Sequence, residues 1–149
     1  MTRFPFLVAV HLVLFKDTQV LLLRRYNTGY MDGSYSVPAG HVDGGEAIKT
    51  AMIREAQEEV GIIIQEEDLE PYVMHRIISP SEERIDFFFK CTTWSGIITN
   101  CEAEKCDELR WCDVDSLPNN VIPYVRFGLE QVMRGEFLTV FNEKTNVSS

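Results

Sequence analysis

The chain has few positive charges for its length and no long apolar segment. It carries 14 lysines and arginines against 23 aspartates and glutamates, a net charge of −9 over 149 residues. A charge of this sign argues against a general surface for polymeric nucleic acid or for an acidic membrane. The longest apolar run, Phe6 to Phe15, is shorter than the roughly 18 residues of a membrane span, and His11 interrupts it. We therefore expect a cytoplasmic protein that binds neither membranes nor polymeric nucleic acid.

Paired cysteine motifs, repeats, low-complexity tracts and interdomain linkers are also missing. The four cysteines lack the C-x-x-C spacing of zinc sites, so we expect reduced thiols at Cys91, Cys101, Cys106 and Cys112. A chain of this length suits one domain that needs no disulfide for stability. We expect a single domain over residues 1–149, with a flexible tail from about residue 142. Both a monomer and a homodimer are compatible with the sequence.

Apolar patterning predicts an α/β fold. The nearly continuous apolar run at 6–15 indicates a strand covered on both faces, and residues 19–24 return from it as a hairpin. The same criteria predict strands at 69–78, 84–94 and 109–114, and a helix from Pro123 to about Arg134. Within the second of these strands we expect Phe87 to Phe89 in the core and Asp86 and Lys90 at the edges.

One further helix is predicted from about residue 44 to 60. Asp43 and Glu46 have the spacing of a capping box, and Gly61 suits the left-handed position that ends a helix. The residues expected to face the core recur at helical spacing: Ile48, Ala51, Met52, Ala56 and Val60.

The acids of this helix fall in an unexpected place. Glu55, Glu58 and Glu59 form one strip along the edge of the apolar face, where like charges destabilise the helix and burial costs more. Helical geometry directs Arg54 away from the centre of the strip, so a hard divalent cation is one candidate for the neutralising charge. The other interpretation is a solvated acidic face, and the spacing alone favours neither.

The stretch from Gly40 to Ile62 resembles the Nudix box, G-x5-E-x7-R-E-U-x-E-E-x-G-U, in which U is apolar. Seven residues match its fixed positions: Gly40, Glu46, Arg54, Glu55, Glu58, Glu59 and Gly61. Ala56 and Ile62 fill apolar positions, and the order of the other elements is similar to that of a minimal Nudix domain. Seven fixed residues within 23 positions make a specific signal.

The resemblance implies a fold and a reaction. The fold would be an α/β/α sandwich, with a mixed curved sheet between the catalytic helix and a C-terminal helix. The reaction would be attack of water on a pyrophosphate link in a nucleoside diphosphate-linked substrate. Mg²⁺, with Mn²⁺ as a substitute, would be held by the Gly40 carbonyl, Glu55, Glu58 and Glu59.

The resemblance also suggests roles for other residues. Glu55, Glu59 or Glu102 would act as the general base, while Glu46 and Arg54 would brace the helix and position Glu55. Within Glu102-Ala103-Glu104-Lys105, Glu102 is preferred over Glu104 as a further metal ligand or base, with a pair of solvated loop acids as the alternative.

Substrate contacts are expected near the end of the second strand. Arg24 or Arg25 would bind a phosphate, although two exposed arginines at a strand end are an equally good interpretation. Asn27, Tyr30 and Tyr35 are candidates for contacts with a base.

The first choice of substrate is a nucleoside triphosphate, including an oxidised one, cleaved to a monophosphate and pyrophosphate. ADP-ribose or a nucleotide sugar is the alternative substrate. A nucleotide-binding module without hydrolytic activity is the alternative of a different class.

Overall fold

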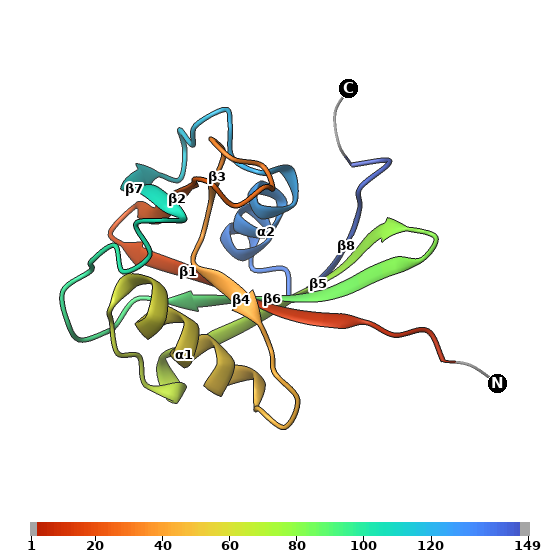
Figure 1. Ribbon diagram of the computed structural model, residues 1–149, viewed down its shortest axis with the longest axis horizontal. Coiled ribbons are helices and arrows are strands. Elements are labelled where there is room, and N and C mark those ends of the chain that lie inside the picture. The colour runs from red at the N-terminus through yellow and green to blue at the C-terminus, as the bar shows by residue number, and fades with distance from the viewer. Residues whose placement is uncertain (1–2, 147–149) are drawn as a thin grey trace.

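The computed structural model describes residues 3–146, which form a sheet with one long helix on each face (Figure 1). The strands are β1 (Leu7–Lys16), β2 (Gln19–Arg25), β3 (Tyr35–Ser36), β4 (Ala39–His41), β5 (Glu70–Ser79), β6 (Glu82–Cys91), β7 (Cys106–Asp113) and β8 (Leu138–Asn142). The helices are α1 (Ile48–Val60), α2 (Pro123–Arg134) and a single 3₁₀ turn, η1 (Glu66–Asp68). The predicted α/β/α sandwich is confirmed.

The sheet is mixed, and β1 joins its two parts. The strand order is β3-β2-β1-β6-β5-β8, with β4 also paired to β1 and β7 to β2. β1 runs parallel to β6, and β5 runs parallel to β8, whereas the other pairs are antiparallel. Leu7 to Leu14 of β1 pair with β6, and Ala9 to His11 pair with β4 as well, whereas the last two residues pair with β2. The predicted hairpin is therefore present, and its first strand lies in the centre of the sheet.

Both faces of β1 are buried, which explains its continuous apolar sequence. Val10, Leu12 and Leu14 belong to the core beneath α1, whereas Val13 and Phe15 belong to the core beneath α2. Alternate side chains of a strand point to opposite faces of its sheet, so a strand between two helices needs apolar residues at nearly every position.

The predicted strands at 69–78, 84–94 and 109–114 and the helix at 123–134 correspond to β5, β6, β7 and α2. The short strands β3, β4 and β8 were not predicted. Two or three residues carry too little periodicity to be recognised, and β8 pairs with β5, far from it in sequence. Asn142 ends β8 and a hydrogen-bonded turn follows to Asn146. Residues 147–149 lie outside the described part, so the flexible tail expected from about residue 142 stays a prediction.

The expectation that Asp86 lies at a strand edge is wrong. β6 lies inside the sheet, and Asp86 points to the same side as Phe88, where it is fully buried. Arg76 of β5 compensates it through a hydrogen bond of 2.8 Å from Nε to Oδ2. Strand order decides this burial, and strand order is not encoded in local periodicity. Lys90 stays partly exposed.

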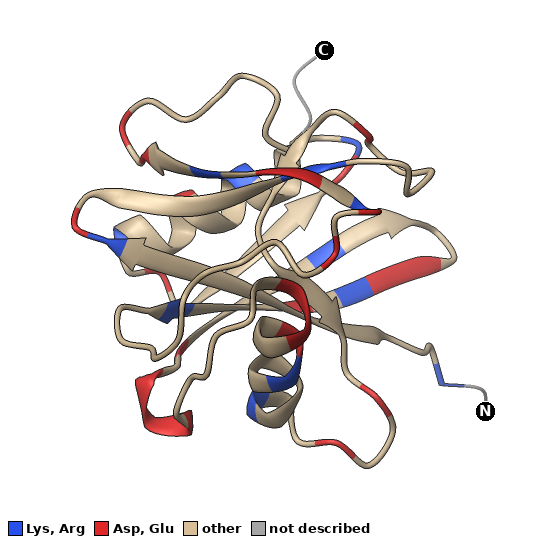
Figure 2. Cartoon of the chain, turned by 60° about the vertical axis from the view of Figure 1, so that its left-hand side comes forward, with Lys and Arg blue, Asp and Glu red and all other residues tan. Residues whose placement is uncertain are grey.

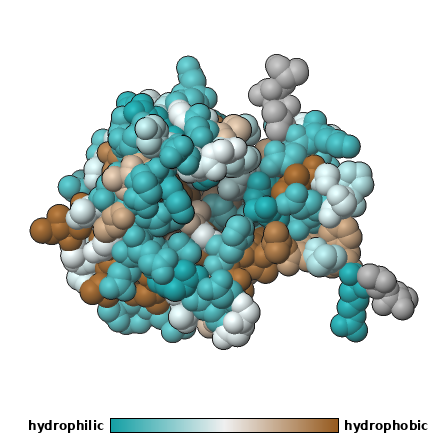
Figure 3. All heavy atoms as spheres, viewed as in Figure 1, coloured by the Kyte–Doolittle hydropathy of each residue, from teal (hydrophilic) through white to brown (hydrophobic). Residues whose placement is uncertain are grey.

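The surface gives two further observations. The side seen in Figure 3 is largely hydrophilic, with hydrophobic groups near the N-terminal segment, where Phe4 and Phe6 are exposed. Leu138 and Val140 of β8 are exposed as well. No helix within residues 3–146 has the length and apolar character needed to cross a membrane.

Candidate functional site

Helix α1 begins later than its sequence predicts. It starts at Ile48 rather than near residue 44, and the side chain of Asp43 does not cap it. Gly45 has a φ of +79°, which is incompatible with a right-handed helix, so residues 43–46 form a separate turn. The turn is closed by the N–H of Asp43, which donates to the Glu46 carboxylate at 3.2 Å. The predicted C-terminus is confirmed, since Gly61 has a φ of +71° and its N–H donates to the Gln57 carbonyl.

The apolar face of α1 is buried as predicted. Ala51, Met52, Ala56 and Val60 are fully buried, and Ile48 packs at the margin of the same core. Because this face packs against the sheet, the acids along its edge lie at the boundary between helix and sheet. Figure 2 shows the acidic last turns of α1 (red) approaching the sheet.

The prediction that Arg54 points away from the acidic strip is wrong. Its Nε donates to Glu46 Oε2 at 2.7 Å and its Nη2 donates to Glu46 Oε1 at 3.0 Å. Nη1 donates to Glu55 Oε1 at 2.9 Å and to Glu58 Oε2 at 3.3 Å. The long side chain bends along the helix, which the direction of a Cα–Cβ bond does not reveal. These hydrogen bonds raise the pKa of Arg54 and lower that of Glu46.

Position 40 requires glycine because the Glu55 side chain leaves no space there for a Cβ atom. A Cβ on Gly40 would lie 2.1 Å from Cδ and 2.2 Å from Oε1 of Glu55, so any side chain there would displace the carboxylate. The φ of Gly40 lies outside the left-handed region, so close packing against Glu55, and not the backbone conformation, requires glycine at this position.

Glu59 is the most perturbed carboxylate of the site. Burial, followed by repulsion from Glu55, raises its pKa to about 9, even though Oε2 accepts a hydrogen bond of 2.9 Å from the N–H of Ala39. Burial also raises the pKa of Glu55, against the opposing effect of Arg54. The charges of Glu58 and Glu102 raise the pKa of both residues. The four carboxylates therefore share one region whose negative charge is incompletely compensated.

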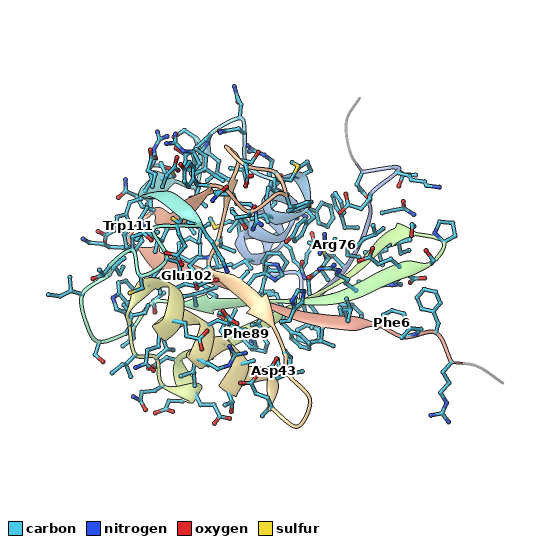
Figure 4. The ribbon with its side chains drawn as sticks, viewed as in Figure 1. Phe6, Asp43, Arg76, Phe89, Glu102 and Trp111 are labelled. Carbon is cyan, nitrogen blue, oxygen red and sulfur yellow. The ribbon has the colours of Figure 1, made fainter. Side chains whose placement is uncertain are left out.

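These residues line one cavity of about 710 Å³ between α1, β4 and the loops that follow β2 and precede β7. Gly40, Glu55, Glu58, Glu59 and Glu102 all belong to its wall. Figure 4 shows Glu102 near the C-terminal end of α1 and Asp43 near its N-terminal end. The N–H of Cys101, next to Glu102, donates to the Glu59 carbonyl at 3.1 Å and fixes this loop to the helix. Glu104 is exposed outside the lining.

The two neighbouring arginines of β2 differ in position. Arg25 lines the cavity, together with Asn27. Arg24 lies outside it, and its Nε donates to Asp107 Oδ1 at 2.8 Å. The sequence could not separate them, because the partner of Arg24 is 83 residues away.

Tyr35, a candidate for a base contact, lies outside this cavity, whereas Lys105 lies in its wall. Tyr35 is buried on the α2 side, and its hydroxyl donates to Glu108 at 2.6 Å. Lys105 lines the cavity and adds a positive charge that sequence reasoning did not propose. Its position directly after the Glu102–Glu104 acids was the available signal.

The chemistry of the cavity wall suits a hard divalent cation. It offers five carboxylates, those of Asp43, Glu55, Glu58, Glu59 and Glu102, and, at Gly40, a residue that has only backbone oxygen to give. In the present arrangement, no three His, Cys, Asp or Glu side chains within residues 3–146 are grouped closely enough to hold a metal ion. In this arrangement Arg54 is ion-paired with both Glu55 and Glu58. The donor set fits a cation, because Arg54 contacts Glu55 through Oε1 and Glu58 through Oε2, and the second oxygen of each carboxylate is not hydrogen bonded to Arg54.

The raised pKa of Glu59 predicts a pH dependence of the stability of the metal-free protein. The folded protein keeps this proton up to about pH 9, whereas an ordinary glutamic acid releases it near 4.5. Its contribution to the free energy of unfolding is therefore complete below pH 4.5 and is lost as the pH rises toward 9. Burial lowers the pKa of His11 from 6.5 to about 4, so His11 acts in the opposite sense, and only below pH 6.5.

We expect the free energy of unfolding in EDTA to decline from pH 6.5 toward pH 9, the window set by these two groups. Glu59→Gln should remove most of the decline, because glutamine has a similar shape and no charge. Chemical denaturation at a series of pH values measures this, with Glu104→Gln as the control. Parallel curves for the wild type and Glu59→Gln would contradict the assignment.

Comparison with known proteins places this geometry in a family. The model of the NUDIX domain matches residues 5–134. An ADP-ribose pyrophosphatase of Methanocaldococcus jannaschii is 39% identical over 56 residues, which span 38% of this chain and 32% of that protein. An 8-oxo-dGTP diphosphatase of Proteus vulgaris is 28% identical over 92 residues, 62% of this chain and 80% of that protein.

A solved structure agrees with this assignment. The crystal structure of a MutT NUDIX hydrolase from Burkholderia pseudomallei superposes with a TM-score of 0.77 and 26% identity, covering 86% of this chain and 98% of that one. Five of the seven fixed box residues line one cavity, and the match over residues 5–134 shows that the chain belongs to the Nudix hydrolase family.

Proposed function

We propose that the protein is a Mg²⁺-dependent pyrophosphohydrolase that cleaves a nucleoside triphosphate to a monophosphate and pyrophosphate. The observation that carries this proposal is the composition of the cavity. Four carboxylates occupy the wall formed by α1 and the loop before β7, and Arg25 and Lys105 line the same space. A cavity with both charges suits a polyphosphate that is bound together with cations, as an acidic protein requires.

The carboxylate wall would hold the cation. Glu55, Glu58, Glu59, Glu102 and the Gly40 carbonyl are the ligands we propose for Mg²⁺, or for Mn²⁺ in its place. When bound, the ion would offset the charge of the phosphates and make its water more acidic. Glu46 would act indirectly: it binds Arg54, and Arg54 in turn binds Glu55 and orients its carboxylate.

The proton of the attacking water would pass to a carboxylate of the same wall. Glu55, Glu59 and Glu102 are the candidates, since all three line the cavity. The crowding that raises the pKa of Glu59 to about 9 in the metal-free protein favours a proton acceptor at this position once positive charge is added nearby.

The part of the substrate beyond the phosphates would extend toward α2. A second hollow of about 380 Å³ is lined there by Tyr30, Arg76, Arg84 and Tyr124, among others. It adjoins the first cavity, because Nη1 of Arg84 lies 3.4 Å from Nε2 of His41, and His41 belongs to the first lining. Aromatic rings beside hydrogen-bonding side chains suit a planar base.

Two alternatives to this function are outcomes of the test below. The first is cleavage of ADP-ribose or a nucleotide sugar, and it is supported by the relative that is 39% identical over 56 residues, an ADP-ribose pyrophosphatase. A binding module without hydrolysis is disfavoured, because every charged residue of the box is retained and Glu55, Glu58 and Glu59 line one cavity.

The substrate class is tested by Mg²⁺-dependent turnover on a panel of nucleotides. The panel contains unmodified and oxidised nucleoside triphosphates, ADP-ribose, nucleotide sugars and dinucleotides, with the products identified. We expect one triphosphate to give monophosphate and pyrophosphate. Preferential cleavage of ADP-ribose or of a sugar nucleotide would overturn the substrate and keep the reaction. Absence of turnover across the panel, with the fold intact, would overturn the enzyme assignment.

Glu58→Gln tests the carboxylate wall with the substrate found in this way. Glu58 is more than half exposed, so we expect the fold to be retained. Turnover should fall at least about a hundredfold through loss of a metal ligand. Glu104→Gln, in the exposed loop, should leave turnover unchanged. Unchanged hydrolysis by Glu58→Gln would exclude this residue as a ligand.

Gly40→Ala tests the close approach of β4 and α1. The new methyl group would displace the end of the Glu55 side chain, which is flexible, so the stability cost should be at most about 2 kcal/mol. Turnover should fall by about a hundredfold, because a reacting group would be misplaced. Gly44→Ala is the matched control, since nothing lies within 4 Å of its added Cβ. Equal turnover of the two variants would show that the position of Glu55 is not critical.

A further inference from the structure

The loop between β2 and β3, residues 26–34, holds the side chain of Arg25 in an unusual way. Arg25 Nε donates to the Tyr30 carbonyl at 2.7 Å, and Nη2 donates to Thr28 Oγ1 at 3.0 Å. The guanidinium also lies 5.2 Å from the centre of the Tyr30 ring. Thus all the contacts that orient Arg25 come from residues three to five positions further along the chain.

Asp32 fixes the hydroxyl that Arg25 uses. Thr28 Oγ1 donates to Asp32 Oδ1 at 2.6 Å, and the N–H groups of Thr28 and Gly29 donate to the same carboxylate at 3.0 Å each. A hydroxyl has one proton and two lone pairs. Two acceptors lie in reach of the hydroxyl proton, Asp32 Oδ1 at 2.6 Å and the Tyr30 carbonyl at 3.0 Å, and the carboxylate is the nearer. In either case the two lone pairs of Oγ1 accept from Arg25 Nη2 at 3.0 Å and from the N–H of Tyr30 at 3.2 Å. The Thr28 hydrogen bonds also lower the pKa of Asp32, so this carboxylate remains an acceptor.

This arrangement orients Arg25 without neutralising it. Within residues 3–146, Arg25 makes no direct ion pair: a hydroxyl and a carbonyl accept its hydrogen bonds, and the charge of Asp32 acts on it from behind Thr28. Arg24 shows the contrast, since its guanidinium lies directly against Asp107 and 3.7 Å from Glu108. A guanidinium that is fixed and still charged is suited to bind an anion.

The loop is also held in a conformation that needs support. Asn27 and Met31 have φ values of +54° and +50°, which residues other than glycine adopt rarely. The contacts of Asp32 close the loop from within, and Asn120 Nδ2 donates to the Gly33 carbonyl at 2.8 Å from outside. Such a loop presents Arg25, Asn27 and Thr28 to the cavity as one preorganised unit.

We propose that Asp32 and Thr28 are positioning residues, which hold the guanidinium of Arg25 toward the phosphates of the substrate. Thr28 carries no charge, and the charged Asp32 lies outside the cavity lining. Their effect passes through Arg25, so the inference rests on the phosphate-binding role proposed for that residue. They should affect binding of the polyphosphate and leave the carboxylate wall intact.

Thr28→Val and Thr28→Ser are the variants that test the hydroxyl. Valine keeps the shape and removes the hydrogen bonds, whereas serine keeps them. With the nucleotide hydrolysed in the panel, we expect Thr28→Val to raise KM about five- to tenfold, with kcat within about twofold of the wild type. Thr28→Ser, which keeps the hydroxyl, should have the KM of the wild type. Thr18→Val, at the exposed tip of the β1–β2 hairpin, controls for the substitution itself.

A double-mutant cycle with Arg25→Gln shows whether Thr28 acts through Arg25. Arg25→Gln should raise KM at least about tenfold, and adding Thr28→Val should then have little further effect. Independent, multiplying effects of the two substitutions would overturn the positioning role while leaving the phosphate role of Arg25. An unchanged KM in Arg25→Gln would overturn both assignments.

Asp32→Asn provides a second route to the same conclusion. It weakens the acceptor of the Thr28 hydroxyl and should raise KM in the same direction, with the thermal unfolding of each variant recorded alongside. A drop in kcat with unchanged KM, in either Thr28→Val or Asp32→Asn, would contradict the proposal.

Discussion

The site depends on the hydrogen bonds and ion pairs that the guanidinium of Arg54 makes with three glutamates. This guanidinium joins Glu46, in the turn before α1, to Glu55 and Glu58 on the helix. Without it, three acids would face one another at the edge of a buried helix face, where repulsion and burial both oppose folding. Its contact with Glu55 also keeps that carboxylate in the space that Gly40 leaves free. The turn, the helix and β4 are therefore joined through one side chain.

One guanidinium cannot compensate all of the acids that line the cavity. Arg54 lowers the pKa of Glu46, yet the pKa values of Glu55 and Glu59 remain raised because both are buried near other carboxylates. The metal-free protein thus holds negative charge that a protonated Glu59 relieves in part. In the proposed complex a cation and a polyphosphate would change this balance, and the groups that crowd one another without a metal would serve as its ligands.

Local sequence rules predicted much of this arrangement and failed at identifiable points. Gly61, the buried face of α1 and the helix at Pro123 follow from periodicity and capping, which depend on neighbours in the chain. The start of α1 was missed because Gly45 turns left-handed, and the direction of Arg54 was missed because a long side chain can bend along its helix. The burial of Asp86 and the pairing of Arg24 depend on residues 10 and 83 positions away, which only the folded sheet brings near.

The Nudix box and the second hollow lie on different faces of the sheet, which explains why the box predicts a class of reaction and not a substrate. The Nudix box lies on β4, α1 and the turn between them, all on one side. The second hollow is built from β5, β6 and α2, where Arg76, Asp86 and Tyr124 form a buried polar group. Burial lowers the pKa of the adjacent His11 to about 4, so His11 is neutral there and Arg76 supplies the positive charge opposite Asp86. No residue of this group belongs to the box, so a complete box does not determine which base would bind in the hollow proposed for it.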